Sequence, residues 1–292
     1  MIYHNGLRIG LHTSKSGSLE RAALKAHEVG ANCFQIFSSS PRTWRAGRPD
    51  PADIKLLKTA RKKYDLKPLV IHDSYLINLA SREPAIRTSS IAAFRGEIER
   101  AIAIGADYLV MHPGNHKGQS VEEGLCGVIE GIEEAAKGLK SRTLQILLEN
   151  TVGSGAQLGS RFEELRAMRE LTEQRIAFKI GFCLDTCHCF ASGRYNVATP
   201  DGLERTVEDI NVILGLENVK VIHTNDSKGV LASHLDRHAN IGEGHIGLEG
   251  FRRILNHPKL KTKPFILETP VDNPGDDKKN VDMLKSLCAR VS

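Results

Sequence analysis

The sequence predicts a single-domain α/β protein over residues 1–292, folded as a (β/α)8 barrel, also called a TIM barrel. Three observations point to this fold. Short apolar runs alternate with longer amphipathic stretches along the chain, as strands and helices do in βαβ units. The runs are continuous rather than alternating, which is typical of parallel strands buried on both faces. The length of 292 residues fits a barrel, whose typical size is ~250 residues.

The apolar runs supply eight strand candidates, one for each strand of such a barrel. In chain order they cover residues 7–11, 33–37, 68–71, 108–111, 144–148, 180–184, 219–222 and 265–267. Parallel strands must be joined by crossover connections, which are usually helices. The segments between these runs should therefore be helical.

The helix candidates are the amphipathic stretches at residues 18–29, 50–64, 84–104, 119–138, 160–173, 200–214, 247–256 and 276–288. Residues 84–104 show the helical period well, because their large apolar side chains recur on one face. Arg95, Glu97 and Arg100 are expected on the opposite face, away from the core.

Composition and charge narrow the class of protein. With 40% hydrophobic and 26% charged residues, the chain resembles a soluble globular protein with a sizeable core. The alternative architecture is a doubly wound open sheet, but no G-x-G-x-x-G follows the first apolar run. The six cysteines contain no C-x-x-C pair, and we expect buried thiols rather than a disulfide framework.

The chain carries no signal for a membrane. Its first residues have no basic region followed by an apolar stretch, and no apolar run approaches the ~20 residues of a membrane span. We therefore expect a cytoplasmic protein without membrane association. The net charge of +5 favours a nucleic-acid partner only modestly, since many metabolic enzymes share it.

The chemistry lies where the strands end. Six consecutive strand candidates finish in a histidine or a carboxylate, namely His72, His112, Glu149, Asp185, His223 and Glu268. The carboxyl ends of barrel strands meet at one mouth, where barrel enzymes keep their active sites. Such a ring is costly to desolvate unless a cation compensates it, and this mixed donor set favours zinc, manganese or iron. Any one of these residues alone is more often structural, but six in order predict a metal centre.

A polar loop after the seventh strand candidate adds further donors. Asp236 and His238 are spaced so that both side chains can reach one ion from an extended segment. With His188, which follows Asp185 closely, they could hold a third metal. A lone D-x-H is more often a solvated loop, but this one lies just beyond a strand that already ends in a ligand candidate.

At this point the sequence resembles the endonuclease IV family of apurinic/apyrimidinic endonucleases. The resemblance runs from about residue 8 to residue 270 and rests on seven segments in order. They are H-D-S-Y-L-I-N-L at 72–79, H-P-G at 112–114, L-E-N-T at 148–151, L-D-T-C-H at 184–188, H-T-N-D-S-K at 223–228, D-R-H at 236–238 with the glycines up to 244, and L-E-T-P at 267–270.

The resemblance implies a trinuclear zinc centre, because all nine of the family's metal ligands are matched. His72, His112 and Glu149 would hold one zinc ion; Glu149 would bridge to a second, held also by Asp185, His223 and Glu268; His188, Asp236 and His238 would hold the third. Manganese or iron at one position is left open, since the ligand types do not decide between these metals.

The resemblance also implies the reaction and its substrate. The family cuts double-stranded DNA on the 5′ side of abasic sites, leaving a 3′-hydroxyl, and is linked to trimming blocked 3′ ends. Glu149 and Glu268 would be the catalytic carboxylates, Glu268 by orienting the attacking water. Arg42, Tyr75 and Leu76 would contact DNA at the lesion, with Lys228 and Arg237 on phosphates. The roles of Trp44 and His116 stay open, and we expect a monomer.

Two other functions compete with this interpretation. A sugar isomerase or epimerase on the same barrel would also use Glu149, Asp185, His223 and Glu268, but it would not need the other five ligand candidates. A DNA-damage binding protein with a structural metal would be non-catalytic. Structural zinc sites usually include cysteine, however, whereas this donor set is rich in carboxylates.

Overall fold

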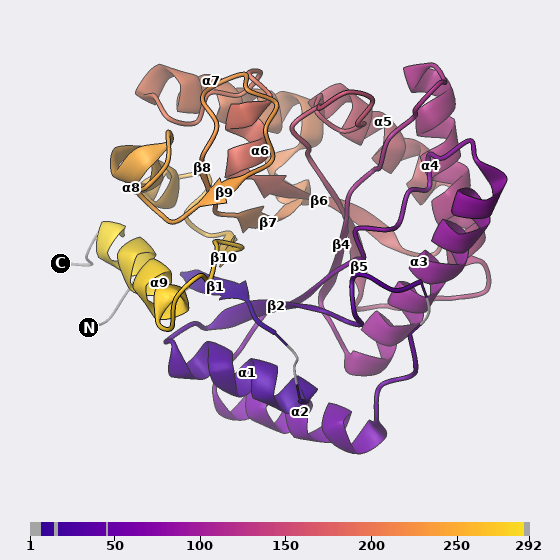
Figure 1. The fold of residues 1–292 in the computed structure, drawn as a ribbon, viewed down its shortest axis with the longest axis horizontal. Coiled ribbons are helices and arrows are strands. Elements are labelled where there is room, and N and C mark those ends of the chain that lie inside the picture. The colour runs from indigo at the N-terminus through magenta and orange to yellow at the C-terminus, as the bar shows by residue number, and fades with distance from the viewer. Residues whose placement is uncertain (1–6, 15–16, 45, 289–292) are drawn as a thin grey trace.

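The protein is a closed barrel of eight parallel strands, seen in a computed structural model that describes residues 7–14, 17–44 and 46–288. The strands run around the barrel in the order β1-β10-β7-β6-β5-β4-β3-β2. Helices surround the strands on the outside (Figure 1). The predicted (β/α)8 fold is therefore confirmed, and the closed order excludes the doubly wound open sheet.

The predicted elements are all present, with ends that differ by two residues at most apart from one helix. The barrel strands are β1 Arg8–His12, β2 Cys33–Phe37, β3 Leu69–His72, β4 Tyr108–Met111, β5 Gln145–Glu149, β6 Lys179–Asp185, β7 Val219–His223 and β10 Pro264–Leu267. The helices are α1 Leu19–Glu28, α2 Pro51–Lys63, α3 Pro84–Ile104, α4 Val121–Ala136, α5 Phe162–Glu173, α6 Thr186–Ala191, α7 Pro200–Asp209, α8 Gly247–Asn256 and α9 Asp276–Leu287.

Four short elements were not predicted from the sequence. They are helix α6, the antiparallel pair β8 (Asp226–Ser227) and β9 (His238–Ala239), and a 3-10 turn at Leu216–Asn218. The predicted helix 200–214 also changes character, because α7 passes at residue 210 into a π-helical turn, Ile210–Leu214. These elements are too short for an apolar period to mark them.

Local sequence explains where the helices begin and end. Helix α4 starts with a capping box, in which Ser120 and Glu123 each accept a hydrogen bond from the other's backbone N–H. Helix α2 starts at Pro51, capped by the carboxylate of Asp50. Helix α3 ends at Gly105, whose φ of 76° is the left-handed conformation that glycine adopts without strain.

Two prediction errors concern buried polar groups. Glu97 and Arg100 of α3 were expected to face solvent, but only 2% and 8% of their surfaces are exposed. The carboxylate of Glu97 pairs with Arg100 and accepts hydrogen bonds from Ser38 and Ser39, which follow β2. Their charges are tolerated inside because each is paired.

The cysteines agree with the sequence only in part. Cys126 is exposed rather than buried, and the six cysteines are all free thiols.

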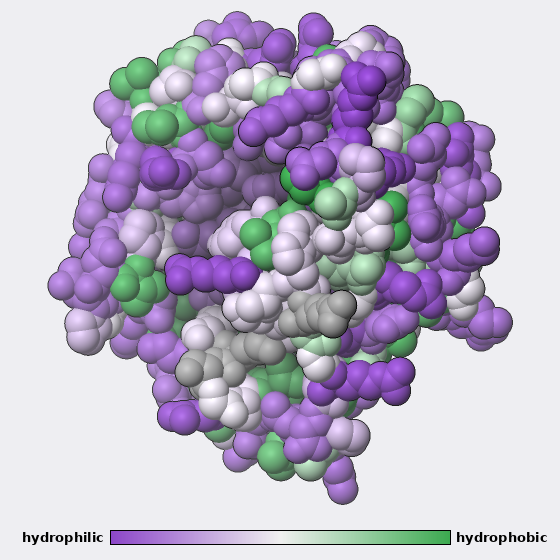
Figure 2. Space-filling model, turned by 45° about the vertical axis from the view of Figure 1, so that its right-hand side comes forward, coloured by the Kyte–Doolittle hydropathy of each residue, from purple (hydrophilic) through white to green (hydrophobic). Residues whose placement is uncertain are grey.

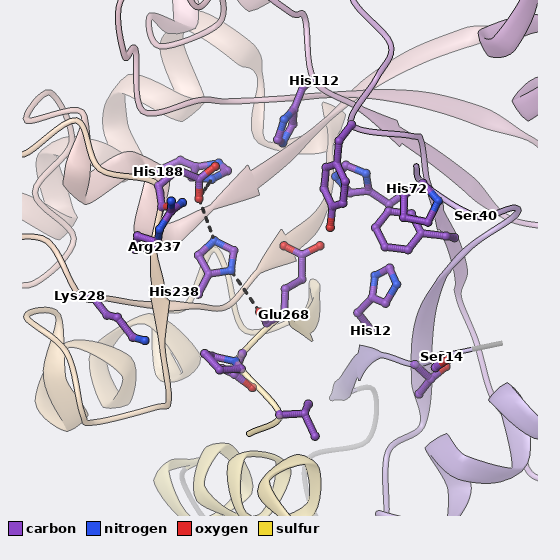
Figure 3. Close-up of a pocket in the computed structure, with 18 of the residues that line it drawn as sticks. His12, Ser14, Ser40, His72, His112, His188, Lys228, Arg237, His238 and Glu268 are labelled. Carbon is purple, nitrogen blue, oxygen red and sulfur yellow. Dashed lines mark hydrogen bonds and ion pairs between the residues drawn. The ribbon is translucent and has the colours of Figure 1, made fainter. Parts of the chain in front are cut away.

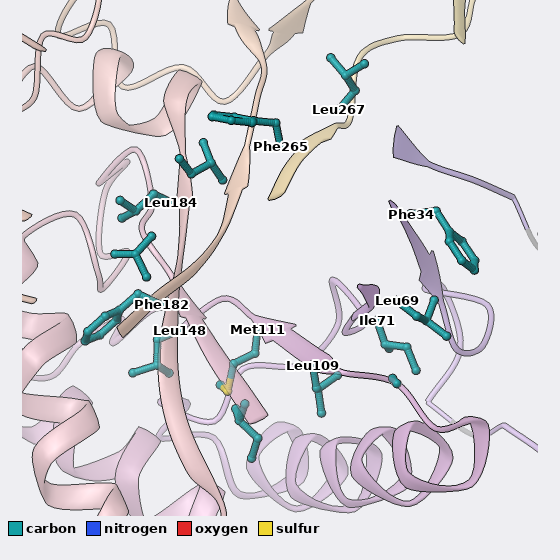
Figure 4. Close-up of a cluster of buried hydrophobic side chains, with 14 of the residues drawn as sticks. Phe34, Leu69, Ile71, Leu109, Met111, Leu148, Phe182, Leu184, Phe265 and Leu267 are labelled. Atoms are coloured by element: carbon teal, nitrogen blue, oxygen red, sulfur yellow. The ribbon is translucent and has the colours of Figure 1, made fainter. Parts of the chain in front are cut away.

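The core has two layers, one on each side of the strands. The larger layer lies between the strands and the helices, and Figure 4 shows part of it around Phe34, Leu148 and Phe265. The smaller layer fills the inside of the barrel with Cys33, Val70, Val110, Leu147, Cys183, Val221 and Ile266. This inner layer closes the barrel beneath its mouth and forms a base for the polar groups above it.

Within the described residues, none of the helices is both long and apolar enough to cross a membrane.

Candidate metal centre

A ring of polar side chains lies directly above the inner apolar layer. Because strand side chains alternate between the two faces, the residue two positions after each member of that layer also points into the barrel. These residues are Gln35, His72, His112, Glu149, Asp185, His223 and Glu268. On β1, His12 occupies the equivalent place two residues after Gly10. The alternation of the strands therefore brings all six predicted strand-end residues together.

Glu149 is at the centre of this ring, and its side chain is fully buried. Its Oε2 lies 3.1 Å from Nε2 of His72 and 3.1 Å from Nε2 of His112. Its Oε1 lies 2.9 Å from Nδ1 of His223. Burial alone would raise the pKa of Glu149, but the nearby His223 and His112 lower it well below its usual range. The carboxylate is therefore charged and faces both sides of the ring.

Three groups of ligand candidates have donor atoms within 4.8 Å of one another and together contain the nine predicted ligands. They are His72 with His112 and Glu149; Glu149 with Asp185, His223 and Glu268; and His188 with Asp236 and His238. We call the first two the floor groups and the third the loop group. Glu149 belongs to both floor groups, as a bridging ligand must.

Two further groups contain cysteine, and their thiols are neutral in the metal-free protein. Cys183 lies near Glu149 and His223, and Cys187 near Asp185 and His238. Burial raises the pKa of the Cys183 thiol well above its usual range, and burial also raises that of Cys187. Because the thiolate is the metal-binding form, a metal would first have to displace the protons of these two buried cysteines.

The loop group joins a helix start to a distant loop. His188 is on α6, and its backbone N–H donates to the carboxylate of Asp185, which caps that helix, at 2.9 Å. Nδ1 of His188 is 2.8 Å from the carbonyl of Asn150, and Nδ1 of His238 is 3.1 Å from the carbonyl of Glu268. Each Nδ1 must therefore carry the proton, which leaves Nε2 of both rings as the free donor atom.

These two Nε2 atoms are buried and lack a hydrogen-bond partner among the described residues. Nε2 of His188 lies 3.3 Å from Oδ1 of Asp236, which is within ion-pair distance but lacks hydrogen-bond geometry. Buried polar atoms are nearly always satisfied, and two such nitrogens facing one carboxylate form a group that could hold a metal ion. Figure 3 shows His188 and His238 on the side of the cavity opposite His12.

The loop itself is anchored by the buried carboxylate of Asp226, on β8. This carboxylate accepts hydrogen bonds from the backbone N–H groups of Gly242, Gly244, Ile246 and Gly247. A Cβ on Gly244 would lie 2.6 Å from Oδ1 of Asp226 and 2.5 Å from the carbonyl oxygen of Ser227, so only glycine fits there. This anchoring and the β8–β9 pairing together place His238 over the ring.

The pKa shifts show which groups of the ring carry charge in the metal-free protein. Burial alone would lower the pKa of His72, but the hydrogen bond and charge of Glu149, together with the charges of Glu268 and Asp73, outweigh burial and raise the pKa to about 10. Burial would raise the pKa of Glu268, but His223, His72 and His238 together outweigh burial and lower the pKa to about 2. Burial lowers the pKa of His12 to about 4. The carboxylates therefore stay charged and hold protons on the imidazole nitrogens. A metal would have to displace those protons in order to bind the same nitrogens.

The ring opens into a cavity of about 900 Å³ at the mouth of the barrel. In Figure 2, hydrophilic residues surround a hollow near the middle of the visible face. Of the predicted DNA contacts, Tyr75, Lys228 and Arg237 line this cavity. Arg42 is exposed and Leu76 half-buried outside its lining. Trp44 is also exposed, and Nδ1 of His116 lies 2.7 Å from the carbonyl of Gln119, away from the cavity.

Sequence reasoning missed two members of the polar environment, Gln35 and His12. Gln35 lies in the middle of β2 and not at the end of its apolar run, whereas His12 directly follows the run 7–11, so the end of that run does mark it. The signal that finds both is the period of two, counted from the inner apolar layer rather than from the end of the run.

Comparison with known proteins agrees with this geometry. Residues 23–287 match the family model described as "Xylose isomerase-like TIM barrel". A protein of Solibacter usitatus named "Probable endonuclease 4" is 58% identical over 281 residues, which cover 96% of this chain and 97% of that protein. A relative of the same name from Halothermothrix orenii is 43% identical over 96% of this chain and 99% of its own.

The chain belongs to the endonuclease IV family. The crystal structure of endonuclease IV from Thermus thermophilus superposes with a TM-score of 0.83 at 37% identity, covering 96% of this chain and 98% of that one. The barrel is shared more widely, as with 3-keto-D-glucoside 4-epimerase YcjR from E. coli, at a TM-score of 0.66 and 14% identity over 96% of this chain and 98% of that one. That likeness shows the fold alone.

Proposed function

We propose that the protein is a zinc-dependent DNA repair endonuclease that hydrolyses the phosphodiester bond on the 5′ side of an abasic site in double-stranded DNA. The products would be a 3′-hydroxyl and a 5′-deoxyribose phosphate, and the same site would trim blocked 3′ ends. The observation that carries this proposal is the juxtaposition of the loop group with the two floor groups around one cavity. The name of the relatives, endonuclease 4, supports the same activity.

The donor set fits three zinc ions. Imidazole and carboxylate donors suit zinc, and His188 and His238 turn their Nε2 atoms, which the backbone carbonyls do not use, to the position between them. The two floor groups would hold the other two ions, with Glu149 common to both. One of the three positions would also accept manganese or iron, because these ligands do not discriminate strongly among such metals.

Bound zinc would supply an acidified water at neutral pH and would neutralise charge that develops on the phosphate. The chain's own residues would do the rest. Glu149 holds its charge between the two floor groups and fixes their separation. Glu268 lines the cavity, and its low pKa keeps it a carboxylate that can accept a hydrogen bond from the attacking water and so orient it. No side chain has to act as the nucleophile.

The cavity wall offers the contacts that an abasic site requires. Tyr75 is 69% exposed, and its ring packs edge-on against Phe37 with 5.2 Å between the centroids. An exposed planar ring held in this way can fill the gap that a displaced nucleotide leaves in the stack. Arg42 and Leu76 would contact the duplex beside it. Lys228 and Arg237, both exposed, would contact phosphates.

A sugar isomerase or epimerase is the second candidate, because Glu149, Asp185, His223 and Glu268 form the one donor group that such an enzyme would use. Such an enzyme would use the floor group around Glu149, Asp185 and Glu268. The loop group, including the unpartnered Nε2 atoms of His188 and His238, would have no role in such an enzyme. A non-catalytic damage-binding protein would likewise have no use for a carboxylate-rich centre beneath an open cavity.

The test is incision of a labelled duplex that carries one stable abasic analogue, beside an intact duplex, with zinc content measured on the same sample. We expect incision only on the 5′ side of the analogue and about three zinc ions per chain. Turnover of small sugars with one or two ions and no incision would support the isomerase instead. Tight binding of the abasic duplex without incision at full metal loading would support the binding protein.

A further inference from the structure

Gln35 is a buried amide inside the barrel, in a position that the metal ligands occupy on other strands. It is the middle residue of β2, and none of its surface is exposed. It lies two residues after Cys33 of the inner apolar layer, as His72 lies two residues after Val70. A polar side chain buried at such a place needs partners for its donors and its acceptor.

The partners of Gln35 are two ligand candidates and His12. Its Oε1 is 2.8 Å from Nε2 of His223. Its Nε2 is 2.6 Å from Oε1 of Glu268 and 3.1 Å from Nδ1 of His12. An amide has two N–H donors and one carbonyl acceptor, so these contacts use both donors and the acceptor. The amide therefore joins β2 to β7 and to the residue that follows β10.

The contacts determine which way the amide faces. If the amide were turned by half a rotation, its oxygen would face the carboxylate of Glu268, and no proton would lie between the two acceptors. With the nitrogen on Glu268, the amide oxygen must face His223. Because that oxygen can only accept, Nε2 of His223 must carry a proton.

The opposite nitrogen of His223, Nδ1, is thereby the one that can bind an ion. Nδ1 lies 2.9 Å from Oε1 of Glu149 and 3.2 Å from Oε2 of Glu268, which are the other donors of the same floor group. A metal-binding imidazole is usually oriented in this way, by a partner that holds the proton on its other nitrogen. Gln35 would do so while also directing the carboxylate of a second ligand.

We propose that Gln35 is a positioning residue of the metal centre, which holds His223 in the Nε2-protonated form and orients Glu268 so that both present free donor atoms to one ion. The proposal rests on the proposed function, since it assumes that the floor group of Glu149, Asp185, His223 and Glu268 binds a metal. It assigns Gln35 to one ion of the three, because the partners of the amide belong to that floor group.

The variant that tests this is Gln35→Met, which keeps the length of the side chain and removes the amide. Its matched control is Ile36→Met, which places the same side chain on the outer face of the same strand, where Ile36 is fully buried. Zinc occupancy would be measured at graded free zinc concentrations, with circular dichroism to show that each variant folds. Loss of such an outer partner typically weakens metal binding about 10–100-fold.

We expect one of the three ions to bind Gln35→Met about 10–100-fold more weakly, while the other two bind as in the wild type. We also expect kcat for incision to fall with little change in KM for the duplex, because the DNA contacts are untouched. Ile36→Met should bind all three ions normally. Wild-type affinity for every ion in a folded Gln35→Met protein would overturn the proposal.

A second measurement needs no variant. In zinc-loaded wild-type protein, nitrogen NMR should find the His223 proton on Nε2, with Nδ1 unprotonated. A proton on Nδ1 would overturn the proposal, even if Gln35→Met failed to fold. Failure of the proposed function looks different, because the wild type would then bind no zinc or leave the abasic duplex intact whatever the His223 tautomer.

Discussion

The floor groups and the loop group contain the same kinds of donor, but the fold positions them by different means. Glu149, Asp185 and His223 have fully buried side chains carried by barrel strands. Asp236 comes from a loop, and 43% of its side chain is exposed, while His238 in the same loop is 17% exposed. The floor is held by the strand ladder, whereas the loop is held by hydrogen bonds to Asp226.

This difference separates a rigid part of the centre from an adjustable one. The floor groups cannot move without disrupting the barrel, so their metals should be bound tightly and together. The loop group depends on a few backbone hydrogen bonds, and segments held in this way open at a lower cost in free energy. Loss of the shared ligand Glu149 should therefore affect both floor ions, and changes in the loop should affect one ion.

The largest effect is expected from Glu149→Gln, which removes the charge shared by the floor groups. Breaking a buried ion pair costs about 3–5 kcal/mol, which corresponds to at least ~100-fold in affinity. We expect both floor ions to be weakened and incision to fall by at least ~100-fold. Metal analysis and incision rates check this. Unchanged activity would falsify the bridging role of Glu149.

The second effect is on metal loading and depends on pH. The pKa of His72 is raised to about 10 in the metal-free site, so its ring carries a proton at neutral pH that a metal must displace. Each displaced proton makes affinity rise about tenfold per pH unit until the pH reaches that pKa. The folding stability of the metal-free protein changes with pH in the opposite direction to its metal affinity. It falls as the pH rises through about 10, because the His72–Glu149 ion pair is then lost.

Zinc titration at about pH 6 and about pH 8, with a dye that reports proton release, measures this linkage. We expect tighter binding at the higher pH and the same proton release from His72 at both values, because its pKa of about 10 leaves the ring protonated at each. Equal affinity at both values would show that the floor imidazoles are already unprotonated in the metal-free protein.

A smaller effect is expected from Asp226→Asn, which tests the loop alone. A hydrogen bond to a charged group contributes about 1.5 kcal/mol or more, so the loop ion should be weakened about tenfold. The floor ions should keep their affinity, and amide hydrogen exchange should accelerate in residues 242–247. Asp201→Asn, at an exposed position in α7, is the matched control. Weakening of all three ions alike would contradict the separation of floor from loop.

The smallest effect is expected from Tyr75→Ala, which leaves both sets of ligands in place. Stacking of a base on an aromatic ring contributes about 1–3 kcal/mol, and we expect about 1 kcal/mol, or roughly fivefold weaker binding of the abasic duplex, because the ring is largely exposed. Metal content should not change. Tyr75→Phe should bind normally, since the ring and not the hydroxyl makes the contact. A loss of zinc in Tyr75→Ala would place this residue in the metal centre instead.

The barrel and the position of the floor could be predicted because both follow from one repeated pattern. Most of the strands are apolar runs that end in a polar residue or are directly followed by one, as at His72 and Glu149, and parallel strands bring those ends to one mouth. Gln35 broke the pattern by lying inside its run. The burial of Glu97 and Arg100 could not be predicted either, because it depends on Ser38 and Ser39, which lie far from α3 in the sequence.

The measurement that tests the central claim most directly is anomalous X-ray diffraction at the zinc absorption edge on crystals of the zinc-loaded protein. We expect two peaks at the floor, one on each side of Glu149, and a third between His188, Asp236 and His238. A single peak beside Glu149, Asp185, His223 and Glu268, with nothing at the loop group, would contradict the three-metal centre and favour isomerase chemistry.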